Sequence, residues 1–208
     1  LEQNVIAQDL EDINIEMIKN NKDILTELFS IEDIGYIRQC HSDKIFEYNH
    51  EIQNGDALYS SDKKVAVGIF TADCVPVLIY DKTLEIVAAV HSGWRGTYHK
   101  ITTKTIMKLI EDKGSKVEDI IVYIGPHIHQ CCYEISNGLK ERFLEAGITE
   151  AAFKGRRLDL SLVIKEDLRT MGILDSNIYE ANFCTKCSED YRFHSYRRDK
   201  DLSGRNFS

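Results

Sequence analysis

The order of the expected strands and helices restricts the fold of this chain more than any other feature of its sequence. Short apolar runs rich in β-branched and aromatic residues predict five strands before the long central helix: Tyr36–Gln39, Lys44–Tyr48, Val65–Phe70, Val75–Tyr80 and Glu85–Val90. The central helix is expected from Tyr98 to Asp112 and ends at Lys113-Gly114. Strands that follow one another without intervening helices are not typical of a doubly wound parallel sheet. We therefore expect an α+β fold with mixed sheets.

The remaining elements fit the same fold class. An apolar face predicts a helix over residues 14–29, a further strand is expected at Ile120–Ile124, and two more helices at Ser136–Ala146 and Leu162–Met171. The sequence shows no internal repeat and no glycine-rich nucleotide-binding loop. A length of 208 residues predicts one domain over residues 1–208.

Composition excludes several classes of protein. The net charge of −8, from 26 basic and 34 acidic residues, does not favour a protein that coats nucleic acid or binds anionic membranes. An apolar content of 43% is enough to bury a core. The first residues show no secretory signal, and no apolar run is long enough to span a bilayer. We expect a cytoplasmic protein with neither nucleic acid nor membrane as a partner; its oligomeric state is not indicated.

The cysteines are unevenly spaced in a chain large enough to fold without disulfides, so reduced thiols are expected. The six are Cys40, Cys74, Cys131, Cys132, Cys184 and Cys187. The Cys184-x-x-Cys187 pair has no second pair of the same spacing, so it does not by itself predict a structural zinc site. The adjacent Cys131-Cys132 pair lies in a loop-like segment with His127 and His129, which leaves a second metal site open.

Reactive side chains gather at the ends of predicted strands. His91 directly follows an apolar run and precedes a turn bounded by Gly93 and Gly96, where ligands can approach the backbone closely. Cys74 lies 17 residues earlier, at an end of the preceding strand, which suits two neighbouring strands joined by a turn. With His41 from a third strand end, two imidazoles and one thiolate could converge.

Such a group supports more than one chemistry. His41, Cys74 and His91 would bind Zn²⁺ and leave a fourth tetrahedral position for water, which the metal can ionise near neutral pH. The same donors suit Cu²⁺. Cys74 and His91 could instead form a thiolate–imidazolium pair for acyl transfer. Spacing alone does not separate these alternatives.

The C-terminal segment and one aromatic side chain are candidates for binding substrate. Residues 191–205 are more basic than the chain as a whole, and guanidinium groups present a planar fork of donors to phosphate oxygens. Arg95, Arg197 and Arg198 are therefore candidates for a phosphate site. Trp94 is either a core or lid aromatic or a platform on which a base stacks.

Four segments together resemble the laccase-domain family, whose members were once called multicopper polyphenol oxidases and are now described as purine nucleoside phosphorylases. These segments are Thr71-Ala72-Asp73-Cys74-Val75-Pro76-Val77-Leu78, His91-Ser92-Gly93-Trp94-Arg95-Gly96-Thr97, Ile124-Gly125-Pro126 with Cys132-Tyr133-Glu134, and Ser195-Tyr196-Arg197-Arg198-Asp199 with Gly204-Arg205. They occur in the family's order and cover most of the chain. The Asp-Cys-x-Pro and His-x-Gly-Trp-Arg-Gly motifs are highly specific.

The resemblance implies a zinc site on His41, Cys74 and His91, with copper as the alternative metal. It implies phosphorolysis of adenosine, inosine and methylthioadenosine to the free base and ribose 1-phosphate, together with adenosine deamination, in which zinc-activated hydroxide would attack the purine. The expected catalytic residues are Cys74, His91, Asp73 and Arg95. A phosphate site made by Arg95 with Arg197 or Arg198 is inferred from charge and not from the family.

The resemblance also implies a mixed α/β domain related to cysteine hydrolases, and two alternatives stay open. One is a hydrolase that uses Cys74 and His91, and the other is a copper-dependent polyphenol oxidase. The sequence departs from the family in two respects. It begins at Leu1 without the usual Phe-Ser-x-Arg-like opening, so a truncated N-terminus is expected. It has His127 where smaller residues or cysteine are commoner, so His127 could add a ligand or a general acid near the metal.

Overall fold

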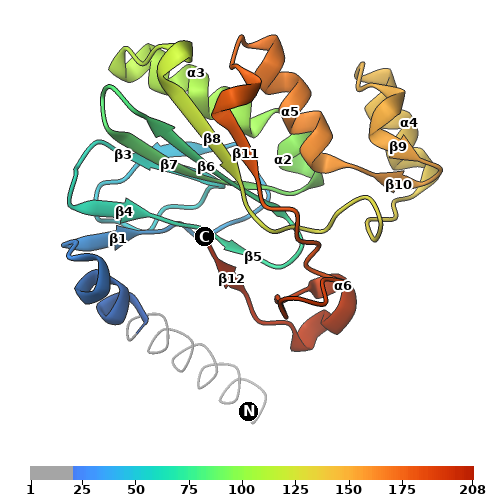
Figure 1. The fold of residues 1–208 in the computed structure, drawn as a ribbon, viewed down its shortest axis with the longest axis horizontal. Helices are drawn as coiled ribbons and strands as arrows, with labels where there is room; N and C mark the ends of the chain where they lie inside the picture. Colours follow the sequence, from blue (N-terminus) through green and yellow to red (C-terminus); the bar gives the residue numbers. More distant parts are fainter. Residues whose placement is uncertain (1–20) are drawn as a thin grey trace.

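The computed structural model describes residues 21–208 and is built on a six-stranded mixed sheet (Figure 1). The strand order is β11-β8-β6-β7-β3-β2. The bounds are β2 Ile45–Glu47, β3 Ala57–Ser60, β6 Val75–Asp81, β7 Ile86–Ser92, β8 Ile120–Ile124 and β11 Ile178–Glu180. The central strands are antiparallel, whereas β2 pairs with β3 and β11 with β8 in parallel. The expected mixed α+β fold is confirmed.

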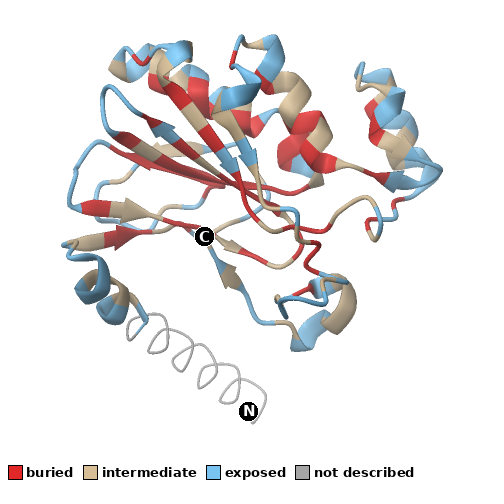
Figure 2. Cartoon of the chain, in the orientation of Figure 1, coloured by how far each residue is buried: buried red, intermediate tan, exposed pale blue. Residues whose placement is uncertain are grey.

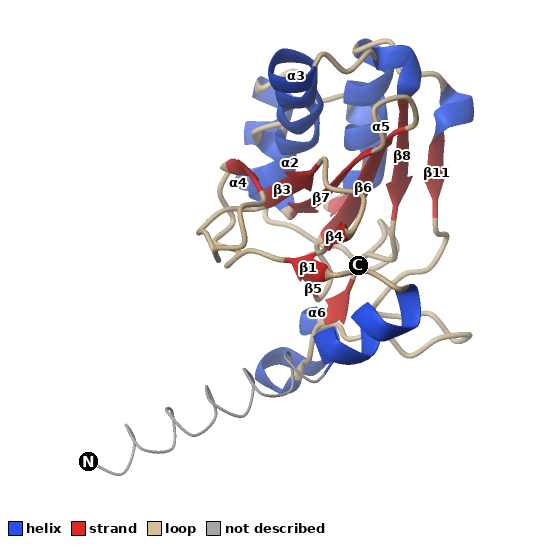
Figure 3. Cartoon of the chain, turned by 90° about the vertical axis from the view of Figure 1, so that its left-hand side faces the viewer, coloured by secondary structure: helices blue, strands red, loops and turns tan. Residues whose placement is uncertain are grey.

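Helices cover one face of this sheet (Figures 1 and 3). They are α2 Trp94–Tyr98, α3 Ile101–Lys113 and α5 Leu160–Thr170, while α4 Asn137–Glu145 lies farther out, near the small ribbon of β9 Phe153–Lys154 and β10 Arg157–Leu158. Helix α3 ends as the sequence predicts, because Gly114 adopts a left-handed conformation with φ of 76°. Short 3₁₀ turns occur at Val117–Asp119, Glu150–Ala152, Asp175–Asn177 and Lys200–Leu202.

The central strands are largely buried (Figure 2), and their side chains alternate between two core clusters, one on each face of the sheet. In β6, Val77 and Ile79 belong to the main core beneath the helices, whereas Leu78 packs on a smaller cluster on the opposite face. That cluster contains Ile37, Leu58, Ile69 and Ala89. The parallel pair of β1 Asp33–Gly35 and β4 Val65–Val67 and the antiparallel pair of β5 Phe70–Thr71 and β12 Asn206–Phe207 complete this side.

The structure corrects several expected boundaries. Residues 36–39 do not form a strand, and only Arg38 makes an isolated bridge, to Asn54. The expected strand over residues 65–70 is divided into β4 and β5. Gly68 lies between them and leaves room for Phe207, whose ring would lie 2.2 Å from a Cβ at this position. Of the helix expected over 14–29, residues 21–29 are helical and the rest lies outside the described residues. The helix expected from Tyr98 begins instead at Ile101, because Tyr98 is the last residue of the separate helix α2. The six-stranded sheet also contains β3 and β11, which were not expected.

The C-terminal segment packs at the end of the sheet away from the helical layer (Figures 1 and 3). It contains α6 Tyr196–Asp199, begun by Ser195, whose hydroxyl accepts a hydrogen bond from the backbone N–H of Arg198. Chain segments far apart in the sequence thus meet near the start of β6. Within residues 21–208, no helix is both long and apolar enough to cross a membrane.

Candidate metal centre

Two of the three expected ligands are brought together by the β6–β7 hairpin. His91 lies in β7 opposite Pro76 of β6, and Cys74 directly precedes β6. Because the two strands are antiparallel, the start of the first lies beside the end of the second, so ligands 17 residues apart become neighbours. His41 reaches them from a loop between β1 and β2, and its backbone is left-handed with φ of 58°. The predicted hairpin is confirmed, whereas His41 lies in a loop and not at the end of a strand.

The geometry of the three side chains suits a metal ion. One ligand atom from each of His41, Cys74 and His91 lies within 4.8 Å of the others. Cys74 Sγ is 4.0 Å from His41 Nε2, and the two imidazole rings meet edge to face with centroids 4.9 Å apart. His91 is buried, Cys74 is partly buried and His41 is exposed. The group therefore opens toward solvent on its His41 side, where a substrate or a water molecule could complete a tetrahedral site.

A buried carboxylate behind the group fixes its orientation. Asp56, which is 0% exposed, accepts a hydrogen bond from His91 Nδ1 at 2.8 Å and from the backbone N–H of His41 at 3.0 Å. Its other oxygen accepts from the backbone N–H groups of Cys40 and Ser42 and from the Ser42 hydroxyl. Because Nδ1 of His91 is held by Asp56, Nε2 is directed to the metal position. Carboxylate–histidine pairs of this kind orient metal ligands and raise their basicity.

Burial and charge tune the ionisation of the same residues. Burial raises the pKa of Asp56, but hydrogen bonds from His91 and Ser42 outweigh it and hold that pKa well below its usual range. Burial would lower the pKa of His91, yet Asp56 and Cys74 raise it to about 9. The Cys74 thiol is buried as well, but His41 and His91 lower its pKa to about 7. These shifts favour a thiolate beside an imidazolium in the metal-free group, and a bound cation would replace the proton.

Close packing explains the glycine that follows the hairpin. A Cβ on Gly93 would lie 2.8 Å from Cys74 Sγ and 3.3 Å from His41 Cδ2. The backbone of Gly93, with φ of −75° and ψ of −176°, is one that any residue adopts, so only the side chain is excluded.

We expect the substitution Gly93→Ala to displace the Cys74 sulfur and to weaken zinc binding by about 10- to 100-fold, as loss of ligand orientation does. The measurement is a zinc titration in competition with a chromophoric chelator. Gly138→Ala is the matched control, because a Cβ on this α4 residue would meet nothing within 4 Å. Unchanged zinc affinity in Gly93→Ala would show that Cys74 Sγ is not a ligand.

Asp73, expected as a catalytic residue, anchors the C-terminal segment. Its backbone has a φ of 90°, and its buried carboxylate accepts hydrogen bonds from Thr185 Oγ1 at 2.7 Å and from the backbone N–H of Arg197 at 2.6 Å. Both oxygens are thus occupied next to Cys74. We interpret Asp73 as a positioning residue, because its hydrogen bond to the backbone of Arg197 holds that residue beside the candidate metal centre.

The arginines expected at the phosphate site differ in what they contact. Arg95 is exposed and lies over the ring of Trp94, 4.9 Å from its centroid. Arg197 lies over Tyr133 at 4.9 Å and donates one guanidinium N–H to Glu134 O at 2.9 Å. Arg198 donates instead to its own segment: to Asp199 and to the carbonyl groups of Thr185, Lys186 and Phe193. These contacts disfavour Arg198 as a phosphate ligand, because its donors are already used.

His127, expected near the metal, points elsewhere. Its imidazole is buried with His129 and Glu180 in a separate group of ligand-type side chains, and its Nδ1 lies 2.9 Å from Gly125 O. Burial lowers the pKa of His127 to about 4, so it is neutral near pH 7. The structure does not bring it to His41, Cys74 and His91.

Two residues that position the site were not identified from the sequence. Thr185 carries no recognisable signal, because its hydrogen bond to Asp73 joins residues 112 positions apart. Asp56 does carry one: it stands between Gly55 and the apolar run Ala57-Leu58-Tyr59, at the start of a strand. Polar residues beside the ends of buried strands often belong to functional sites, and Asp73 and His91 occupy such positions at β6 and β7.

Comparison with known proteins agrees with these motifs. The sequence model of the family described as multi-copper polyphenol oxidoreductase laccase matches residues 6–208. The chain belongs to this laccase family. The resemblance that the motifs indicate is therefore confirmed for nearly the whole chain.

Two relatives of this chain have names that refer to purine nucleosides. The chain is 43% identical over 200 residues to a purine nucleoside phosphorylase of Clostridium acetobutylicum, covering 94% of this chain and 84% of that protein. It is 30% identical over 197 residues to the adenosine deaminase RL5 of an unknown prokaryotic organism, covering 86% and 74%. The crystal structure of YlmD from Geobacillus stearothermophilus superimposes with a TM-score of 0.82 at 26% identity, over 90% of this chain and 77% of that one.

Proposed function

We propose that this chain is a zinc-dependent enzyme that cleaves purine nucleosides by phosphorolysis and deaminates adenosine. The observation that carries the proposal is the group of His41, Cys74 and His91, oriented by a buried carboxylate and open on one side. The names of the relatives supply the substrate class: purine nucleosides with phosphate.

The donor set fits zinc. Two imidazoles and one thiolate are ligands that zinc prefers, and three protein ligands leave one position open, as in catalytic zinc sites. Bound there, zinc would polarise a substrate oxygen or lower the pKa of a water molecule. Cys74 would contribute its thiolate, and His91 would bind through Nε2 while Asp56 holds its other nitrogen. His41, the exposed ligand, lies where the substrate would enter.

The flanking side chains suit a nucleoside and a phosphate ion. Arg197 and Arg95 are held by stacking on Tyr133 and Trp94, which leaves guanidinium donors for phosphate oxygens. Burial, and after it the charge of the nearby Cys74, raises the pKa of the Tyr133 phenol to about 12. Tyr133 therefore lies close to the candidate metal centre. Trp94 would stack on the purine base. We propose that the arginines place phosphate beside the ribose while the base faces the metal.

A second candidate function is a cysteine hydrolase. Cys74, His91 and Asp56 stand in the order of a nucleophile, a base and an orienting carboxylate, and the lowered pKa of Cys74 suits a nucleophile. Copper chemistry is the third alternative, because the family's description refers to copper and the donor set also suits that metal.

One experiment separates the three. Purified protein is analysed for bound metal and then incubated with adenosine, with and without phosphate, and adenine, inosine and hypoxanthine are resolved chromatographically. We expect zinc in the protein, adenine only with phosphate, and inosine independently of phosphate. Both activities should disappear on treatment with a chelator and return with zinc.

Other results would contradict the proposal. Full activity of metal-free protein, with an electrophilic substrate analogue attached to Cys74, would indicate the hydrolase. Restoration of phenol oxidation by copper, with absorption from a copper–thiolate bond and without nucleoside cleavage, would indicate the oxidase. Nucleoside binding without any product would indicate a binding protein.

A further inference from the structure

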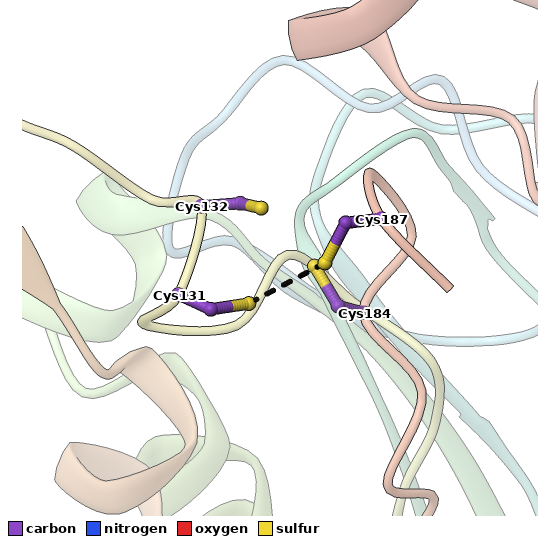
Figure 4. A group of neighbouring side chains, drawn as sticks. All are labelled: Cys131, Cys132, Cys184 and Cys187. Atoms are coloured by element: carbon purple, nitrogen blue, oxygen red, sulfur yellow. Dashed lines mark hydrogen bonds between the residues drawn. The ribbon is translucent and has the colours of Figure 1, made fainter. Parts of the chain in front are cut away.

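Four cysteines outside the proposed catalytic centre come together from two loops (Figure 4). Cys131 and Cys132 lie in the loop after β8, and Cys184 and Cys187 lie in the segment after β11. Because β8 and β11 are parallel neighbours, the two segments leave the sheet at the same edge. Each pair alone was not evidence for a metal site, but the fold unites them.

The separation of the sulfur atoms suits a shared metal ion. All four lie within 4.8 Å of one another, and Cys131 Sγ is 3.6 Å from Cys187 Sγ. A tetrahedron with zinc–sulfur bonds of about 2.3 Å has edges of about 3.8 Å. A disulfide would require about 2.05 Å. The sulfur atoms thus lie at the spacing expected around one zinc ion, and Cys131 and Cys187 are too far apart to be bonded to each other.

Backbone hydrogen bonds hold the two loops in place. Cys184 forms a bridge to His127, and the N–H of Thr185 donates to His127 O at 2.9 Å. The N–H of Ser188 donates to Cys184 O at 2.9 Å, which closes the turn that contains both cysteines of the Cys-x-x-Cys pair. Backbone N–H groups of His129, Cys187 and Lys186 are directed at the Cys184 sulfur and hold it in place.

The neighbouring group of His127, His129 and Glu180 is a weaker candidate for a metal. Glu180 already forms an ion pair with Lys165, whose Nζ lies 2.6 Å from it. His127 has one ring nitrogen on Gly125 O. Two of its three members are thus engaged within the protein, whereas the four cysteines mainly face one another.

We propose that Cys131, Cys132, Cys184 and Cys187 bind a structural zinc ion in an all-thiolate tetrahedral site, separate from the His41/Cys74/His91 centre. Four protein ligands leave no open position, so this site is structural and not catalytic. Zinc there would clamp the loop after β8 to the segment that leads into α6.

The clamp would act on the substrate side of the catalytic centre. Thr185, next to Cys184, bonds to Asp73, and Arg198 donates to the carbonyl groups of Thr185 and Lys186. Tyr133, next to Cys132, supports Arg197. The four-cysteine site therefore fixes both elements between which Arg197 is held.

The test is the number of zinc ions per chain, counted by native mass spectrometry on protein purified without oxygen. We expect two ions in the wild-type protein and one in Cys184→Ser and in Cys187→Ser. Cys74→Ala should keep one ion, and cobalt substituted into this variant should still show thiolate-to-cobalt absorption. Cys40→Ser is the control. Cys40 is an exposed thiol that belongs neither to the four-cysteine cluster nor to the His41/Cys74/His91 group.

Thiol alkylation of the wild-type protein tests the same point if a variant does not fold. Cys131 and Cys187 are exposed, so only bound metal should protect them. We expect iodoacetamide to modify Cys40 but not these two until zinc is removed. One zinc ion per chain with all four thiols reactive, iron in place of zinc, or a disulfide between Cys131 and Cys187 in the anaerobic protein would each overturn the proposal.

Discussion

Replacing Cys74 by alanine is expected to lower kcat/KM for adenosine by roughly 10³-fold or more, which corresponds to about 4 kcal/mol of transition-state stabilisation. Cys74 is the sulfur donor of the proposed catalytic site, and its loss leaves two imidazoles, without a thiolate charge, to hold a divalent cation. Zinc should leave the centre together with the activity. The measurements are the rate of adenine and inosine formation and the zinc content of the same sample.

Cys40→Ala is the matched control for Cys74→Ala. Cys40 is also a thiol near the centre, but its Sγ contacts Asp56 Oδ2 at 3.7 Å and belongs to no ligand group. This variant should keep its zinc and most of its activity. If Cys74→Ala turned over adenosine as fast as the wild-type protein, the proposed function and its metal centre would both be wrong.

Asp56→Asn is expected to damage both the metal centre and the fold. The carboxylate accepts hydrogen bonds from His91 and from three successive backbone N–H groups, those of Cys40, His41 and Ser42. Asparagine keeps one oxygen and turns an NH₂ group toward donors. We expect zinc affinity to fall about 10- to 100-fold. The free energy of unfolding should fall by about 3 kcal/mol, because buried donors lose their acceptor.

The pH dependence of stability offers a second readout for Asp56. Its pKa is lowered in the folded protein, so the carboxylate contributes stability above the unfolded pKa of about 3.8 and loses it as the pH falls further. The free energy of unfolding is measured with denaturant at decreasing pH. Below pH 4 it should fall less steeply in Asp56→Asn than in the wild-type protein, because the variant has no carboxylate to protonate.

Asp81→Asn separates the two effects of Asp56→Asn. Asp81 is also fully buried, but it lies at the other end of β6 and accepts hydrogen bonds from the backbone N–H groups of Thr83 and Leu84. We expect this variant to be destabilised with unchanged zinc affinity. Wild-type zinc affinity in Asp56→Asn as well would show that the carboxylate supports the fold alone.

Local sequence patterns predicted the elements with strong periodicity. The β6–β7 hairpin and helices α3, α4 and α5 lie close to their expected bounds, because each has an apolar pattern of several residues and a clear end. Strands β3 and β11 have only 4 and 3 residues, too few to show a pattern. Residues 36–39 have the composition of a strand, but apart from the single bridge at Arg38 no partner in the described part of the chain pairs with them.

Residue chemistry and motif order were enough to propose the catalytic group. His41, Cys74 and His91 are ligand types at strand ends or turns, and the hairpin that joins two of them is a local structure. The same reasoning misplaced His127 and overvalued Arg198, because the charge of a side chain does not show which partners already occupy it.

The sequence by itself determined the family, the fold class and the types of ligand available, because these depend on motifs and on contacts between neighbouring segments. Only the tertiary structure showed that Asp56 lies behind His91, that Asp73 anchors Arg197, and that two cysteine pairs more than 50 residues apart meet in one cluster. The physical reason is the pairing of distant strands. Because β8 and β11 pair in parallel, the loops that follow them lie side by side. Neither loop sequence alone shows that its cysteines will lie near those of the other.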